Sequence, residues 1–205
     1  MKNKTKVLGL LLAAILLVST TVLGTMAYLT DTQEVKNTFT VGNVAITLDE
    51  AVINANGAAT ATRTTEGNQY HLLPGHTYAK DPTVTVKAGS EESYIRMIVT
   101  VTKADELKSI GYTIFDIIND LNKTAWTYVA DETADVDGTY EFRYNGTATA
   151  GQLPALFTEI TVPGEITNEQ LESINGLAID VVAQAIQADG FEDAAAAWAA
   201  FDAAE

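Results

Sequence analysis

Short apolar alternations, separated by glycine and proline turns, are the feature that most limits how this chain can fold. In one run every second residue is apolar: Ile95, Met97, Val99 and Val101. Arg96, Thr100 and Thr102 take the opposite phase. Because strand side chains alternate between two faces, this run predicts a strand with one buried face. The same two-residue period recurs at 44–48, 83–86, 126–128, 140–144, 156–162 and 179–185.

Other segments favour helices. A short helix is expected over 104–109, and apolar residues spaced three and four apart over 114–121 predict a second one. Thr167 and Gln170 form a capping-box pair before a further short helix. Asp189 and Glu192 are predicted to cap a C-terminal helix over 190–204. About eight short strands with two or three inserted or terminal α-helices favour a mainly β fold, a two-sheet β-sandwich.

The N-terminus has the layout of an export signal. Lys2, Lys4 and Lys6 precede an apolar run over 7–18. Thr25 and Ala27 fit the small subsites of a signal peptidase, so cleavage is predicted between Ala27 and Tyr28. The alternative is an uncleaved anchor over 7–27, a span just long enough to cross a bilayer. Polar residues at 19–21 and 25 weaken that alternative.

These features divide the chain into three parts. Residues 1–27 form the signal peptide, 28–38 an N-terminal segment, and 39–205 a single β domain. The chain contains no cysteine, so the exported domain must be stabilised by packing and hydrogen bonds. Its formal charge of −15 becomes −18 once the three signal lysines are removed. Such a charge opposes nucleic-acid binding, which depends on neutralising phosphates with Lys and Arg.

Three sequence blocks carry a resemblance to a known family. "GTMAYLTD" at the cleavage boundary is followed by "NTFTVGNVAITLDE", and further matches cover 73–101 and 178–198. These blocks resemble the TasA/camelysin family of Gram-positive secreted proteins. Leu29 departs mildly from the pattern, because Phe is commoner there. The matching residues of the first block are Ala27, Tyr28, Thr30, Asp31, Asn37, Phe39, Gly42, Val44 and Ile46.

The resemblance implies a function and a mode of assembly. It implies a jelly-roll-like sandwich, cleavage by a SipW-type signal peptidase, and a secreted or cell-surface structural subunit of a biofilm-matrix fibre. The freed segment 28–38 would be a donor strand that completes the sheet of the next subunit. The expected partners are the peptidase and further copies of this chain, with membrane contact only through the signal. The residues expected in the assembly strand are Tyr28, Leu29, Val35, Phe39 and Val41.

Two other functions stay open. A camelysin-like metallopeptidase would use His71 and His76, but they are five apart across a Pro-Gly turn and lack an adjacent Glu. We therefore predict no enzyme activity, no catalytic or metal-binding residues, and no cofactor. The acidic stretch 131–137 matches a calcium loop poorly and is interpreted as a hairpin turn. A glycan-binding adhesin could use the aromatic series Tyr140, Phe142 and Tyr144, although aromatic strands more often pack in a core.

Overall fold

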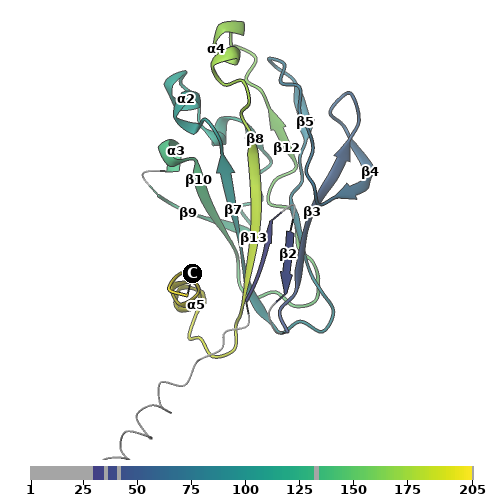
Figure 1. Cartoon of the computed structure of the whole chain (residues 1–205), viewed down its shortest axis with the longest axis vertical. Coiled ribbons are helices and arrows are strands. Elements are labelled where there is room, and N and C mark those ends of the chain that lie inside the picture. The colour runs from purple at the N-terminus through teal and green to yellow at the C-terminus, as the bar shows by residue number, and fades with distance from the viewer. Residues whose placement is uncertain (1–29, 35–36, 41–42, 132–133, 205) are drawn as a thin grey trace, which may run out of the picture.

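The computed structural model describes residues 30–34, 37–40, 43–131 and 134–204. Most of its regular structure is β, as the alternating runs predicted (Figure 1). The strands form three hydrogen-bonded sheets, however, rather than the two that were expected. The third sheet arises because residues near 78, 118 and 160 pair with one another instead of joining either larger sheet.

The largest sheet contains both the first and the last strand of the described chain. Its order is β2-β1-β13-β7-β10-β9, and every neighbouring pair is antiparallel. Strands β7 and β13 form its centre, with Ile179 opposite Val101 and Gln187 opposite Ser93. The bounds are β1 Thr30–Glu34, β2 Asn37–Thr40, β7 Ser93–Val101, β9 Trp126–Val129, β10 Thr139–Tyr144 and β13 Ile179–Gln187.

A four-stranded sheet faces the first one. Its order is β11-β6-β3-β4, and β3 contacts both β1 and β13. The small third sheet has the order β5-β12-β8. The bounds are β3 Ile46–Ile53, β4 Ala59–Thr64, β5 Thr77–Ala79, β6 Thr83–Val86, β8 Ile118–Asn119, β11 Gly151–Gln152 and β12 Glu159–Thr161.

One hydrophobic core lies between the sheets. The alternating residues of β7 all point into it, and each is at most 3% exposed. Ile46 and Leu48 of β3 enter from the opposite sheet. The bulkiest fully buried core side chains are Trp126, Tyr140, Phe142 and Phe157. The two-residue period therefore predicted the buried face of each central strand correctly.

The predicted helix over 114–121 is wrong. Residues Ile114–Asp116 form one 3-10 turn, and Ile118–Asn119 then form β8. Ile114, Ile117 and Ile118 are buried, but from a turn and a strand. The Ile117 carbonyl accepts a hydrogen bond from the Thr161 amide, so pairing with β12 replaces the helical bond. Helix α2, Ala104–Ser109, forms where it was expected.

The C-terminal helix is shorter than predicted, and its cap lies elsewhere. Helix α5 spans Ala194–Asp202, not 190–204. Asp193, not Asp189, is its N-cap, and its Oδ1 accepts a hydrogen bond from the Ala196 amide at 2.8 Å. Gly190 turns the chain with a φ of +91°, which delays the start of the helix. Figure 1 shows α5 far from α2 and α4, beside the other end of the sheets.

The strands β9 and β10 pair as the aromatic alternation predicted. Their connection, interpreted above as a hairpin turn over 131–137, contains a short helical turn, α3 Ala134–Asp137. Gly138 follows with a φ of +71°, and a Cβ at that position would collide with the Val101 carbonyl oxygen. Only glycine fits this exit from the turn.

The predicted capping box is present at helix α4, Asn168–Ser173. The Thr167 hydroxyl accepts a hydrogen bond from the Gln170 amide, and the Gln170 side chain accepts one from the Thr167 amide. Replacing Thr167 by Ala should destabilise the domain by about 1 kcal/mol, because one amide loses its partner. Thr167→Ser keeps the hydroxyl and should stay near the parent. Urea denaturation of both variants measures their free energies of unfolding. If Thr167→Ser loses as much stability as Thr167→Ala, the hydroxyl does not cap the helix.

Candidate functional site: a cavity between the sheets

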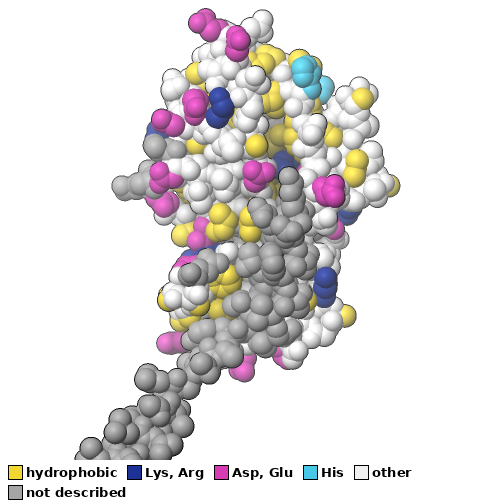
Figure 2. All heavy atoms as spheres, viewed as in Figure 1, with side chains coloured by type: hydrophobic (Ala, Val, Ile, Leu, Met, Phe, Trp, Pro, Cys, Tyr) yellow, Lys and Arg dark blue, Asp and Glu magenta, His cyan; other side chains and the backbone are white. Residues whose placement is uncertain are grey.

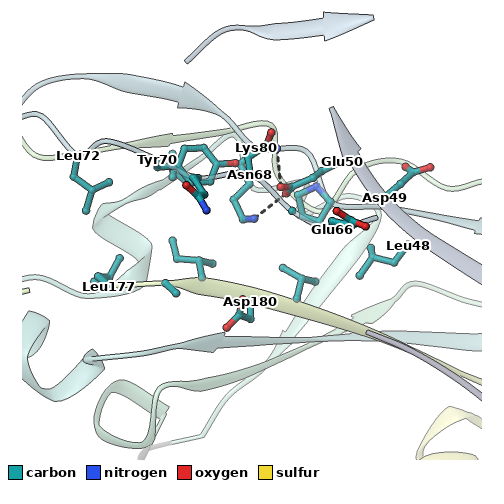
Figure 3. Close-up of a pocket in the computed structure, with 17 residues that line it drawn as sticks. Leu48, Asp49, Glu50, Glu66, Asn68, Tyr70, Leu72, Lys80, Leu177 and Asp180 are labelled. Carbon is teal, nitrogen blue, oxygen red and sulfur yellow. Dashed lines mark hydrogen bonds and ion pairs between the residues drawn. The ribbon is translucent and has the colours of Figure 1, made fainter. Parts of the chain in front are cut away.

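A cavity of about 740 Å³ opens beside the start of β13. One wall comes from β3, the loop after β4, and the segment that joins β5 to β6. The opposite wall is the N-terminal end of β13 (Figure 3). Leu48, Leu72, Pro82, Ile160, Leu177, Ile179 and Val181 supply its apolar lining. The cavity is therefore bounded by residues from all three sheets.

In the part of the chain that the structure describes, the first three residues of β13 are paired on one side only, beside this cavity. Its residues Val182 to Ile186 pair with β1, but β1 ends at Glu34, opposite Val182. Among the described residues, Ile179, Asp180 and Val181 pair with a strand only on the β7 side. Figure 3 shows the side chain of Asp180 directed away from Glu50 and Lys80, which lie on the far wall of the cavity. The main chain at this end of β13 is thus placed to accept a further extended segment.

A buried carboxylate stands in the far wall. Glu50 is 3% exposed, and it follows Ile46 and Leu48 in the inward phase of β3. Its Oε2 lies 2.8 Å from Nζ of Lys80, which is 6% exposed. Lys80 in turn follows buried Tyr78 in the inward phase of its segment. Each ion is costly to remove from water, and the pair offsets part of that cost.

Asn68 completes the cluster around Glu50. Its Nδ2 donates to Glu50 Oε1 at 2.8 Å and to the Ala51 carbonyl at 2.8 Å. Its Oδ1 accepts a hydrogen bond from the Ile53 amide at 3.0 Å. These three bonds hold the amide group of Asn68 in one orientation. Glu50 consequently binds the Lys80 amine through one oxygen and the Asn68 amide through the other.

Tyr70 closes one side of the cluster. Lys80 Nζ lies 5.7 Å from the centre of the Tyr70 ring, a cation–π contact. Burial raises the pKa of the Tyr70 phenol, and the nearby charge of Glu50 raises it further. Figure 3 shows Tyr70, Asn68, Lys80 and Glu50 gathered on one side of the cavity, across from Leu177. A buried phenol with a raised pKa beside a charged partner in a cavity is typical of functional sites.

The residues predicted at the signal-peptide cleavage site are not among those that the structure describes. Thr25, Ala27 and Tyr28, the predicted cleavage residues, are among the residues that the structure does not describe, as are Leu29, Val35 and Val41 of the assembly strand. Phe39 lies in β2 and pairs with Thr32 of β1. The strand expected in 28–38 is represented by β1, which pairs within the same chain with both β13 and β2.

The two histidines line a different cavity, of about 450 Å³. Nε2 of His76 lies 3.1 Å from the Asn56 carbonyl oxygen, and the His76 ring packs against Tyr78. The His71 carbonyl accepts a hydrogen bond from the Tyr78 hydroxyl. Within the described ranges, no group of three or more His, Cys, Asp or Glu side chains is arranged to hold a metal ion.

The aromatic series of β10 belongs mostly to the core. Tyr140 and Phe142 are each 1% exposed, and Tyr144 is partly buried. The Tyr140 hydroxyl donates to Asp135 Oδ1 at 2.9 Å. Phe115, 42% exposed, packs edge-on against Tyr128 and Tyr140. The face in Figure 2 shows acidic side chains spread over several elements instead of gathered in one patch.

Sequence reasoning did not find the cluster of Glu50, Asn68 and Lys80. One signal was present, because Glu50 occupies the next inward position after Val44, Ile46 and Leu48. A carboxylate at such a position must find a partner inside the protein. Asn68 and Lys80 carry no comparable local signal.

Among the residues described, no helix is both long and apolar enough to cross a membrane. Comparison of the chain with protein-family models, with curated proteins and with solved structures found no match.

Proposed function

We propose that this chain is a secreted structural subunit of an extracellular fibre, and that each subunit donates its N-terminal strand to the next. A SipW-type signal peptidase would cut after Ala27 and free the donor segment. The finer fold in this proposal is a jelly-roll-like β-sandwich. The resemblance of residues 27–46 to the TasA/camelysin boundary block motivates the proposal.

The observation that supports strand donation best is the position of β1. It begins close behind the predicted cut and lies between β13 and β2 in antiparallel register, with Thr30 opposite Ile186 and Glu34 opposite Val182. Those contacts are main-chain hydrogen bonds, so the same segment of another copy can make them equally well. Exchange of an identical element between subunits is a low-cost route to assembly.

The open end of β13 adds to this support. Residues 179–181 border the cavity and continue the strand edge that β1 uses. An incoming strand from a second subunit would meet main-chain groups that no described strand pairs on this side, together with the apolar side chains of Ile179 and Val181. Main-chain pairing gives affinity in such complexes, and pockets for alternate side chains give specificity.

The test compares filament formation by the mature chain, residues 28–205, with that of two altered chains. A chain starting at Phe39 lacks β1 and should stay monomeric while keeping its β circular-dichroism signal. Thr32→Pro should also stop assembly, since proline removes an amide donor from the middle of β1. Electron microscopy and sedimentation provide the measurement.

Thr32→Val is the matched control and should form filaments like the parent, because valine keeps the amide and favours strands. A peptide of residues 28–38, added in excess, should bind the chain that starts at Phe39. Strand donation is wrong if the chain starting at Phe39 forms the same filaments as the mature chain.

A further inference from the structure

We infer that Lys80 and Asn68 can become joined by an intramolecular isopeptide bond, with Glu50 as the catalytic residue. This inference rests on the cluster in the cavity wall and does not depend on fibre formation. It assigns to this protein an autocatalytic crosslinking activity and a modification site.

The two groups that such a reaction joins, the Lys80 amine and the Asn68 amide, already contact one carboxylate. Glu50 Oε2 lies 2.8 Å from the Lys80 amine, and Glu50 Oε1 accepts from the Asn68 amide nitrogen at 2.8 Å. The nucleophile and the leaving group therefore contact the same carboxylate, and that carboxylate can move a proton between them. Such positioning replaces much of the entropy cost of bringing two reactants together.

Attack requires the uncharged form of the lysine amine, and Glu50 is the base that contacts it. Glu50 and Lys80 have side chains only 4% and 7% exposed, so their charges are poorly solvated. Transfer of one proton from Lys80 to Glu50 gives an uncharged amine and an uncharged acid. The uncharged amine is the nucleophilic form of lysine.

The Asn68 amide is prepared for attack. Its carbonyl oxygen accepts a hydrogen bond from the Ile53 amide at 3.0 Å, and this donor can stabilise the negative charge that develops on the oxygen during attack. Its nitrogen faces Glu50, which can protonate the departing group. These two bonds and the bond from Nδ2 to the Ala51 carbonyl prevent the amide group from rotating.

The reaction balances without any further reactant. Lys80 Nζ forms a bond to Cγ of Asn68, and the bond from Cγ to Nδ2 breaks. Glu50, which holds the proton taken from Lys80, gives it to Nδ2, and Nδ2 leaves as ammonia. Glu50 then takes a second proton, the one that the attacking nitrogen loses as it becomes an amide. The product is a secondary amide between the two side chains, and Glu50 ends in the protonation state from which it began the attack.

Trypsin digestion of the full chain tests the inference directly. Trypsin cuts after Arg63, Lys80 and Lys87, but an acylated Lys80 is no longer a cleavage site. We expect a single peptide of residues 64–87, lighter than its sequence mass by one ammonia. Separate linear peptides 64–80 and 81–87, both at full mass, would show that Glu50 and Lys80 form an ion pair only.

Variants separate the crosslink from other chemistry. Glu50→Gln should give only the linear peptides, and so should Asn68→Ala, which leaves the Glu50–Lys80 pair in place. Glu66→Gln is the matched control, since Glu66 lines the same cavity but is exposed, and it should still give the crosslinked peptide.

Two results would overturn the assignment. Loss of ammonia in peptide 64–80 with cleavage after Lys80 would mean a succinimide at Asn68. An undiminished crosslink in Glu50→Gln would exclude Glu50 as the catalytic residue.

Discussion

Replacing Glu50 by Ala should lower the free energy of unfolding by about 3–5 kcal/mol. The substitution leaves the buried Lys80 amine without its carboxylate partner and deprives Asn68 Nδ2 of one acceptor. The Glu50→Ala variant also cannot form the proposed Lys80–Asn68 crosslink, so it loses any stabilisation from that bond. Both losses lower the free energy of unfolding. Urea denaturation, extrapolated linearly to water, measures the change.

Glu66→Ala is the control for this prediction. Glu66 is an exposed carboxylate in the wall of the same cavity, and its loss should change stability by no more than about 0.5 kcal/mol. If Glu50→Ala and Glu66→Ala have equally small effects, the buried carboxylate does not stabilise this wall.

Arg96→Ala should release helix α5 from the outer face of the six-stranded sheet. Arg96 is 5% exposed, and its guanidinium donates to Gln184 at 2.6 Å and to Asp202 at 2.5 Å. It also stacks on Trp198, 4.5 Å from the ring centre. A desolvated cation–π contact together with hydrogen bonds to a charged group suggests a loss of about 3 kcal/mol from α5 docking.

The destabilisation caused by Arg96→Ala should be confined to α5, because this helix packs on a small hydrophobic cluster of its own. Ile186, Ala197, Trp198 and Phe201 form that cluster, separate from the main core. Amide hydrogen exchange in α5 should therefore accelerate by about two orders of magnitude, while exchange in β7 and β13 stays slow. Mass spectrometry of peptides that cover 194–202 measures this.

Arg143→Ala is the matched variant for Arg96→Ala. Arg143 lies directly opposite Arg96 on β10, but its side chain is 28% exposed and pairs with Glu141. Its removal should leave α5 protected, since exposed ion pairs contribute at most about 1 kcal/mol. If α5 exchanges as slowly in Arg96→Ala as in the parent, Arg96 does not hold the helix against the sheet.

Local pattern was sufficient to predict the central strands. The inward residues of β7 and β13 stand at every second position, and a strand places such residues on one face whatever its neighbours are. The Thr167–Gln170 capping box was likewise predictable, because both partners lie within one helical turn.

Spacing alone did not decide between helix and strand at 114–121. Ile114, Ile117 and Ile118 fit a helical face, yet the main chain of this segment pairs with β12, about forty positions further along the chain. Short apolar runs remain ambiguous until the partner strand is known. The start of α5 was ambiguous as well, because Asp189 and Asp193 are both residue types that cap helices. The structure uses Asp193.

The amino-acid sequence by itself determined which strands have a buried face, where α2 and α4 form, and the acidic, cysteine-free character of the chain. Only the tertiary structure brought Glu50 to Asn68 and Lys80, which lie 18 and 30 positions away, and Arg96 to Asp202, 106 positions away. The physical reason is the distance along the chain over which each interaction acts. Side-chain alternation and helix capping act between near neighbours, whereas the partner of a buried charge is chosen by how the sheets pack.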